Sequence, residues 1–181
     1  SELADGHDPA RFTRIVHVDA ASGDDASDGL SPLAAKRTLA SAVLASRSLS
    51  FENVIRVASG TYSGIGNRNL DFGGHDIRLE SASGAGETIV DLEGSGPFLT
   101  LNSGETSRSL LDGFTLRNIR NTSALIVMDK TALVIRNCAI SNVKIFGEND
   151  EIEMWYYWEL GGNALLRLTD ATLDMSDTSI S

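Results

Sequence analysis

The sequence predicts an all-β fold, a solenoid of stacked parallel strands closed at its N-terminal end by one helix. The main observation is a self-match, in which residues 123–141 align without a gap on residues 163–181, at an offset of 40. A second match, at an offset of 24, places Leu111 on Ile135. Repeats of this period, made of short strands, are typical of solenoids, in which each coil buries its apolar side chains against its neighbours.

The N-terminal part of the chain is predicted to form a cap on this solenoid. Residues 1–13 are expected to be an irregular leader, and residues 14–19 alternate apolar and polar side chains as a short strand does. After a loop rich in Gly, Asp and Ser, Ser31-Pro32 supplies a helix cap residue and a first-turn proline. Apolar positions across residues 33–46 suit the one helix that the sequence predicts. Residues 14–52 would therefore cover the open end of the first coil.

Residues 53–181 are predicted to form the coils and, since the sequence stops within a repeat, to continue beyond residue 181. Short alternating strands follow one another across Gly-, Asp- and Ser-rich turns, with no helices between them. This order excludes a doubly wound α/β fold, and the scarcity of two-residue hairpin signals favours parallel pairing. Equivalent strands would then stack about 4.8 Å apart. The predicted inward columns are Leu111/Ile135/Met175, Leu116/Ile140/Ile180 and Leu125/Leu165.

Asn118 and Asn142 occupy equivalent positions at a turn of successive coils. Stacked asparagines can bond from side chain to backbone along such a column. We therefore predict a structural ladder at these two residues.

One coil carries an insertion, because the two offsets differ by 16 residues. The insertion covers residues 144–162, which contain both tryptophans, two of the three tyrosines and five acidic residues. Long loops on a regular scaffold usually carry function or are disordered, and four consecutive aromatic residues argue against disorder. The insertion is therefore the leading candidate for a functional site.

Three interpretations of the insertion stay open. In the first, its aromatic residues form a surface that stacks on sugars or docks onto other protein subunits. In the second, its acids bind Ca²⁺, although their spacing is not that of a helix–loop–helix calcium site. In the third, the aromatic residues fold back and merely cover the side of the solenoid. The residues predicted to contact a ligand or partner are Trp155, Tyr156, Tyr157, Trp158, Glu151 and Glu153.

Composition limits the partners of the chain. The formal net charge of −10 and the pI of about 4.6 argue against binding to nucleic acid or anionic lipid, and they are compatible with cation binding, neutral sugars or simple solubility. No apolar run is long enough to cross a membrane, so we expect no membrane insertion. Cys138 is the only cysteine, and three well-separated histidines suggest no metal set. Asn121 begins a glycosylation sequon, which favours a secretory route.

Several segments resemble extracellular right-handed parallel β-helix proteins of the pectin-lyase-like superfamily. The N-terminal segment of that family often contains "DG-x-S-P" and "TL-x-x-A", which occur here at residues 28–32 and 38–42. VIRVASGTYSG at residues 54–64 is similar to its first coil, and LLDGFTLRN at residues 110–118 is similar to its recurrent coil. The resemblance implies a right-handed solenoid in an extracellular or cell-surface protein, of which this chain is the N-terminal part.

The resemblance leaves activity open, because the superfamily includes lyases, hydrolases, epimerases, adhesins and structural proteins on one scaffold. The lyases use a calcium cluster with an Arg or Lys base, and the hydrolases use convergent Asp residues; neither constellation is recognisable in this sequence. We therefore expect a structural or adhesive module that contacts glycans or neighbouring protein subunits, needs no cofactor and is not an enzyme. The alternative is a polysaccharide lyase, similar to pectate lyase, or a glycoside hydrolase that acts on acidic polysaccharide.

Overall fold

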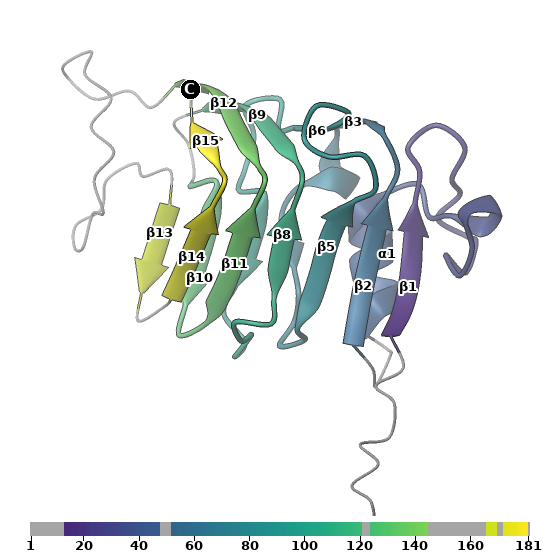
Figure 1. Ribbon diagram of the computed structural model, residues 1–181, viewed down its shortest axis with the longest axis horizontal. Coiled ribbons are helices and arrows are strands. Elements are labelled where there is room, and N and C mark those ends of the chain that lie inside the picture. Colours follow the sequence, from purple (N-terminus) through teal and green to yellow (C-terminus); the bar gives the residue numbers. More distant parts are fainter. Residues whose placement is uncertain (1–12, 48–51, 121–123, 145–165, 170–171, 181) are drawn as a thin grey trace, which may run out of the picture.

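The computed structural model describes residues 13–47, 52–120, 124–144, 166–169 and 172–180 (Figure 1). Within these residues the fold is mostly β, with three parallel sheets and one α-helix. The six-stranded sheet A runs across the front of Figure 1. Its strands, in spatial order, are β1 (Thr13–Val18), β2 (Glu52–Val57), β5 (Ile77–Ser81), β8 (Leu110–Asp112), β11 (Ala132–Arg136) and β14 (Thr172–Ser176).

The other two sheets are built from the strands between those of sheet A. Sheet B contains, in spatial order, β3 (Gly60–Tyr62), β6 (Thr88–Asp91), β9 (Thr115–Arg120), β12 (Ala139–Lys144) and β15 (Ser179–Ile180). Sheet C contains, in spatial order, β4 (Leu70–Asp71), β7 (Leu99–Leu101), β10 (Ile126–Asp129) and β13 (Leu166–Thr169). From β2 onward the chain visits sheets A, B and C in turn. We call one such passage a rung.

Each strand pairs in parallel with the equivalent strand of the next rung, which confirms the predicted parallel pairing. The register also confirms two of the predicted columns: Leu111 pairs with Ile135 and Ile135 with Met175, while Leu116 pairs with Ile140 and Ile140 with Ile180. The third column lies partly outside the described residues, because it includes Leu165.

The core runs between the three sheets. Inward side chains of successive rungs join one cluster, which contains four fully buried aromatic residues: Tyr62, Phe72, Phe98 and Phe114. Burial of such side chains is the main favourable contribution to folding, about 1.5–3 kcal/mol for each large apolar side chain. Because the strands are only two to six residues long, each rung depends on its neighbours for this burial.

Left-handed backbone lets the chain leave sheet A and enter sheet B. The residues at this corner are Gly113, Asn137 and Asp177, with φ of 79°, 51° and 48°. Gly, Asn and Asp tolerate this conformation better than other residues do. Gly113 is also closely packed, since an added Cβ would lie 3.2 Å from Cβ of Ser81.

The predicted helix at residues 33–46 was wrong at its start. Pro32–Ala34 is a 3-10 turn, η1, in which the Ser31 hydroxyl accepts a hydrogen bond from the Ala34 N–H at 3.2 Å. The backbone then becomes extended, and α1 (Leu39–Arg47) begins only at Leu39, five residues after the end of η1. The extended segment pairs with β1 instead of continuing the helix. The Lys36 N–H donates to the His17 carbonyl, and the Lys36 carbonyl accepts from the Asp19 N–H, so part of the free edge of β1 is paired.

The N-terminal cap thus has two parts. The extended segment at Lys36 covers the edge of β1, whereas α1 packs against β1, β2, β4 and η2 (Ile65–Asn67). The helix lies behind sheet A in Figure 1 and buries Leu39, Ala42 and Val43 against the core.

The first turn of α1 is held by a distant side chain. The Asn67 amide oxygen accepts from the Leu39 N–H at 3.0 Å, and its amide nitrogen donates to the Ser63 carbonyl at 2.7 Å. The first N–H groups of a helix have no partner within it, so Asn67, which is 6% exposed, satisfies one of them.

We expect Asn67→Ala to lower the free energy of unfolding by about 1–3 kcal/mol, because it leaves the buried N–H of Leu39 without a partner and removes the hydrogen bond to the Ser63 carbonyl. Urea unfolding followed by fluorescence would measure the change. The control is Asn102→Ala, since Asn102 is exposed and, among the described residues, its amide accepts only a hydrogen bond from the Ser103 hydroxyl. Equal losses in the two variants would contradict the capping role of Asn67.

Candidate functional site

The predicted ligand-binding residues lie outside the described part of the chain. These are Trp155, Tyr156, Tyr157, Trp158, Glu151 and Glu153, and the sequon residue Asn121 lies outside it as well. Their roles stay predictions. The structure does describe where the chain leaves for the insertion: β12 ends at Lys144 in sheet B, and β13 begins at Leu166 in sheet C.

The surface next to this point is the outer side of β6, β9 and β12, where the two ladder asparagines lie. Asn118 donates from Nδ2 to both carboxylate oxygens of Asp91, at 2.7 and 2.8 Å, and Asn142 donates from Nδ2 to Oδ1 of Asn118. Both asparagines have left-handed backbone, with φ of 59° and 51°. The column therefore bonds from side chain to side chain, whereas the sequence suggested bonds to backbone. The side-chain bonding is explained by Asp91, whose carboxylate provides an anionic acceptor at the first position of the column.

Asp91 is held ionised by its neighbours. Partial burial acts to raise its pKa, but hydrogen bonds from Asn118, the Glu93 N–H and the Arg117 guanidinium outweigh burial and lower the pKa below its ordinary value. The Arg117 Nε lies 3.0 Å from Oδ2 of Asp91. Groups that bond to the charged form of a carboxylate favour that form, so Asp91 is suited to anchoring this column rather than to donating a proton.

Several other carboxylates of the described rungs are also bound by donors of the protein. Asp76 accepts from Thr106, Arg108 and Ser109, and although burial opposes them, these bonds lower its pKa. Further pairs are Glu80 with Arg56 and Arg78, Glu93 with Arg68, and Asp112 with Asn137. In the part of the chain that the structure describes, no group of three or more His, Cys, Asp or Glu residues is placed to hold a metal ion.

The structure shows two buried groups to which the sequence analysis assigned no role. Glu105 is 2% exposed, and its carboxylate accepts from the Gly74 N–H at 2.8 Å and the Ser103 N–H at 3.1 Å. It fastens the turn before β8 to the rung below, a contact between distant residues for which the sequence has no local signal. Cys138 is buried beneath the corner of sheets A and B, and burial raises the pKa of its thiol, so it is a poor nucleophile.

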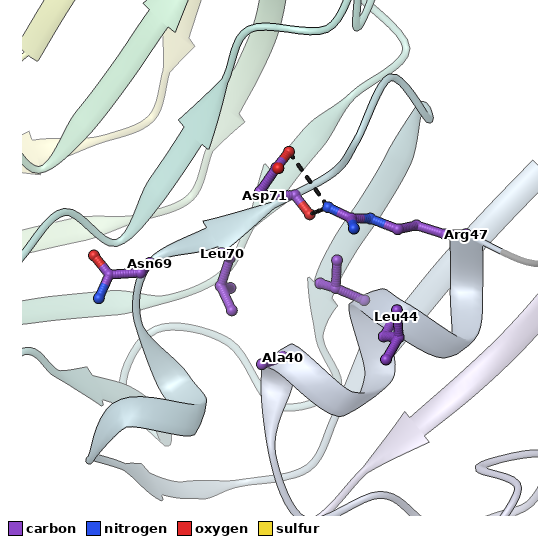
Figure 2. Close-up of a pocket in the computed structure, with 7 residues that line it drawn as sticks. Ala40, Leu44, Arg47, Asn69, Leu70 and Asp71 are labelled. Atoms are coloured by element: carbon purple, nitrogen blue, oxygen red, sulfur yellow. Dashed lines mark hydrogen bonds and ion pairs between the residues drawn. The ribbon is translucent and has the colours of Figure 1, made fainter.

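A shallow depression of about 240 Å³ lies between α1 and β4 (Figure 2). Both apolar and polar side chains line it: Ala40, Val43, Leu44, Arg47, Asn69, Leu70 and Asp71. It exists because a helix stands beside the first strand of sheet C, where later rungs have another strand.

Arg47 closes the gap that this replacement leaves. Figure 2 shows its side chain reaching from the end of α1 to Asp71. The guanidinium donates to the backbone carbonyls of Asp71 and of Phe72, the latter at 3.2 Å, and lies 3.3 Å from the Asp71 carboxylate. The backbone carbonyl at the end of β4, that of Asp71, is thereby satisfied. We interpret the depression as a structural seam between helix and sheet.

Comparison with known proteins adds no relative: no family model, no curated protein and no solved structure matches the chain. Among the described residues, the structure contains no helix that is both long and apolar enough to cross a membrane.

We expect Arg47→Met to lower the free energy of unfolding by about 1–3 kcal/mol, because it removes hydrogen bonds from a charged donor to the carbonyls at the edge of β4. Chemical unfolding would measure this loss. Arg136→Met is the matched control, since Arg136 is exposed and has no ion pair among the described residues. If Arg47→Met is no more harmful than the control, Arg47 does not hold this seam.

We expect Asp91→Asn to lower the free energy of unfolding at pH 7 by about 1–3 kcal/mol. A carboxyl whose pKa is depressed in the folded state contributes stability above its unfolded pKa, and this contribution is lost as the pH falls through the folded pKa. The difference between wild type and variant should therefore shrink from about pH 5 towards about pH 2. Urea titrations across this range test the trend, with exposed Asp129→Asn as control; a difference that does not change with pH would rule it out.

Proposed function

We propose that the chain is a right-handed parallel β-helix resembling the pectin-lyase-like proteins, and that it works as a non-catalytic extracellular structural or adhesive module. It would present the insertion at residues 144–162 to glycans or to neighbouring protein subunits. The repeated passage through three parallel sheets supports the β-helix, since hairpins are absent between the described strands. Parallel crossover connections are right-handed in nearly all known cases, which supports the handedness.

The observation that carries the non-catalytic proposal is the state of the described carboxylates. A glycoside hydrolase needs a carboxylic acid that stays protonated near neutral pH, which requires a raised pKa. The pKa shifts found for the described aspartates, Asp19, Asp25, Asp76 and Asp91, are all downward. Hydrogen bonds to neighbouring turns and rungs cause these shifts, so these acids serve the scaffold.

Position and composition support the insertion as the binding element. It follows the end of strand β12, and the described rungs of this sheet are joined to one another by ladders of polar side chains. A rigid scaffold that positions a variable loop is a common arrangement for recognition. Trp and Tyr offer large contact area with a polar group, which suits both sugar rings and protein surfaces.

The test is a glycan-binding screen of wild type and of a variant with Trp155→Ala and Trp158→Ala. We expect the double variant to bind at least about tenfold more weakly, which is about 1.4 kcal/mol. The control variant carries Leu33→Ala and Leu44→Ala, which remove apolar side chains that are 102% and 66% exposed elsewhere on the surface. Binding that is unchanged in the tryptophan variant would refute the role of the insertion.

A second assay addresses catalysis directly. Wild type is incubated with a panel of polyuronates, with and without Ca²⁺, and the products are followed by ultraviolet absorbance and by reducing ends. We expect neither signal. Unsaturated products would establish a lyase, and reducing ends without unsaturation would establish a hydrolase; either would overturn the non-catalytic proposal.

A further inference from the structure

Two cations stand side by side where sheet B meets the insertion. Arg120 of β9 and Lys144 of β12 are register partners on neighbouring parallel strands, and both are exposed. Neither has a carboxylate partner among the described residues. Like charges directly opposite each other on neighbouring strands repel, so this pair disfavours the folded state unless an anion lies between them.

Two acids of the rung below Arg120 are already engaged by other donors. Glu93 accepts from Arg68 at 2.8 Å and from the Gly64 N–H at 3.1 Å. Asp91 is held by Arg117 and Asn118. The chain carries a formal charge of −10, yet its described acids leave these two cations uncompensated.

The rung below is shaped to receive the Arg120 side chain. Gly94 has a φ of 71°, and a Cβ added there would lie 2.6 Å from Cγ of Arg120. The aliphatic part of Arg120 therefore lies over a glycine, which supports the stem of the side chain while the exposed guanidinium stays available to a ligand. Gly94, Arg120 and Lys144 thus form one column of three rungs, which we call the basic column.

We propose that the basic column is a binding subsite for a tetrahedral oxyanion, the sulfate or phosphate ester of a glycan. A single carboxylate is matched by one arginine through two parallel hydrogen bonds. Two cations of different shape, about one strand spacing apart, are better matched by a group with three terminal oxygens, which can accept from both at once. A sulfate monoester is strongly acidic, so it also stays ionised at and well below neutral pH.

The inference has one part that rests on the proposed function and one that does not. That the ester is carried by a glycan rests on the proposed function, whereas the oxyanion subsite itself depends only on Arg120, Lys144 and Gly94. The two parts can therefore fail separately.

The first experiment tests the subsite with inorganic ions. The melting temperature is measured in sodium sulfate, sodium phosphate and sodium chloride at equal ionic strength, for wild type and for a variant with Arg120→Gln and Lys144→Gln. A control variant carries Lys130→Gln and Arg136→Gln, which remove two exposed cations without an ion pair in the described part. Sulfate stabilises most proteins non-specifically, so the quantity of interest is the difference between variants.

We expect sulfate or phosphate to raise the melting temperature of wild type and control by the same amount, and to raise that of the Arg120/Lys144 variant by at least about 2 °C less. We also expect the Arg120/Lys144 variant to be no less stable than wild type in low-salt chloride, since the repulsion is removed. Equal sulfate and phosphate shifts in all three proteins would overturn the proposal.

The second experiment tests the glycan. Binding of dextran sulfate, dextran phosphate and neutral dextran is measured for the same proteins. We expect the charged polymers to bind at least about fivefold more weakly to the Arg120/Lys144 variant than to the control, with a smaller salt dependence. Equal binding by the two variants would overturn the glycan assignment, and comparison of the two charged polymers identifies which ester is preferred. Loss of binding in the Trp155/Trp158 variant with an intact sulfate shift separates this subsite from the insertion.

Discussion

The register between rungs is the constraint on which the rest of the structure depends. Leu111, Ile135 and Met175 face the core only because β8, β11 and β14 pair at one fixed offset. A slip of one residue would turn the next outward position, occupied by Asp112, Arg136 and Ser176, towards the core. Burial of charge is far more costly than exposure of a leucine, so the core and the outer surface fix the register together. The ladder from Asp91 through Asn118 to Asn142 reinforces this register from outside.

The same constraint explains the irregular features of the N-terminal end. A stack of parallel strands must stop somewhere, and its first strand then has an unpaired edge. Lys36 pairs the end of β1 through its backbone, which is why the helix predicted to begin at residue 33 begins at residue 39. Beside β4, a helix replaces a strand, and a helix side cannot pair with a strand edge. Arg47 and Asn67 supply the missing donors and acceptors from their side chains.

The sequence was informative wherever structure repeats and uninformative wherever it does not. The offsets of 24 and 40 predicted the pairing of Leu116, Ile140 and Ile180 because an inward column needs only a recurrent apolar residue. The contacts of Arg47, Asn67 and Glu105 could not be predicted, since each joins residues that are distant in sequence and occurs once. Similarly, the acidity of Asp91 depends on three donors, two of which belong to the next rung. The predicted ligand-binding aromatic residues lie outside the described part of the chain. Of the candidate site, the structure therefore describes only the strand that precedes the insertion, β12.

Two neighbouring columns on sheet B show how such a scaffold separates structure from function. Asp91, Asn118 and Asn142 satisfy one another, because a carboxylate at one end accepts from amides that can both donate and accept. Further along the chain in the same three rungs lie Gly94, Arg120 and Lys144, and both of these cations only donate. Stacking therefore stabilises the first column, whereas in the second it brings together two donors that lack an acceptor among the described residues. Two adjacent cations do not by themselves stabilise the repeating fold, and their placement on neighbouring strands therefore favours a bound anion.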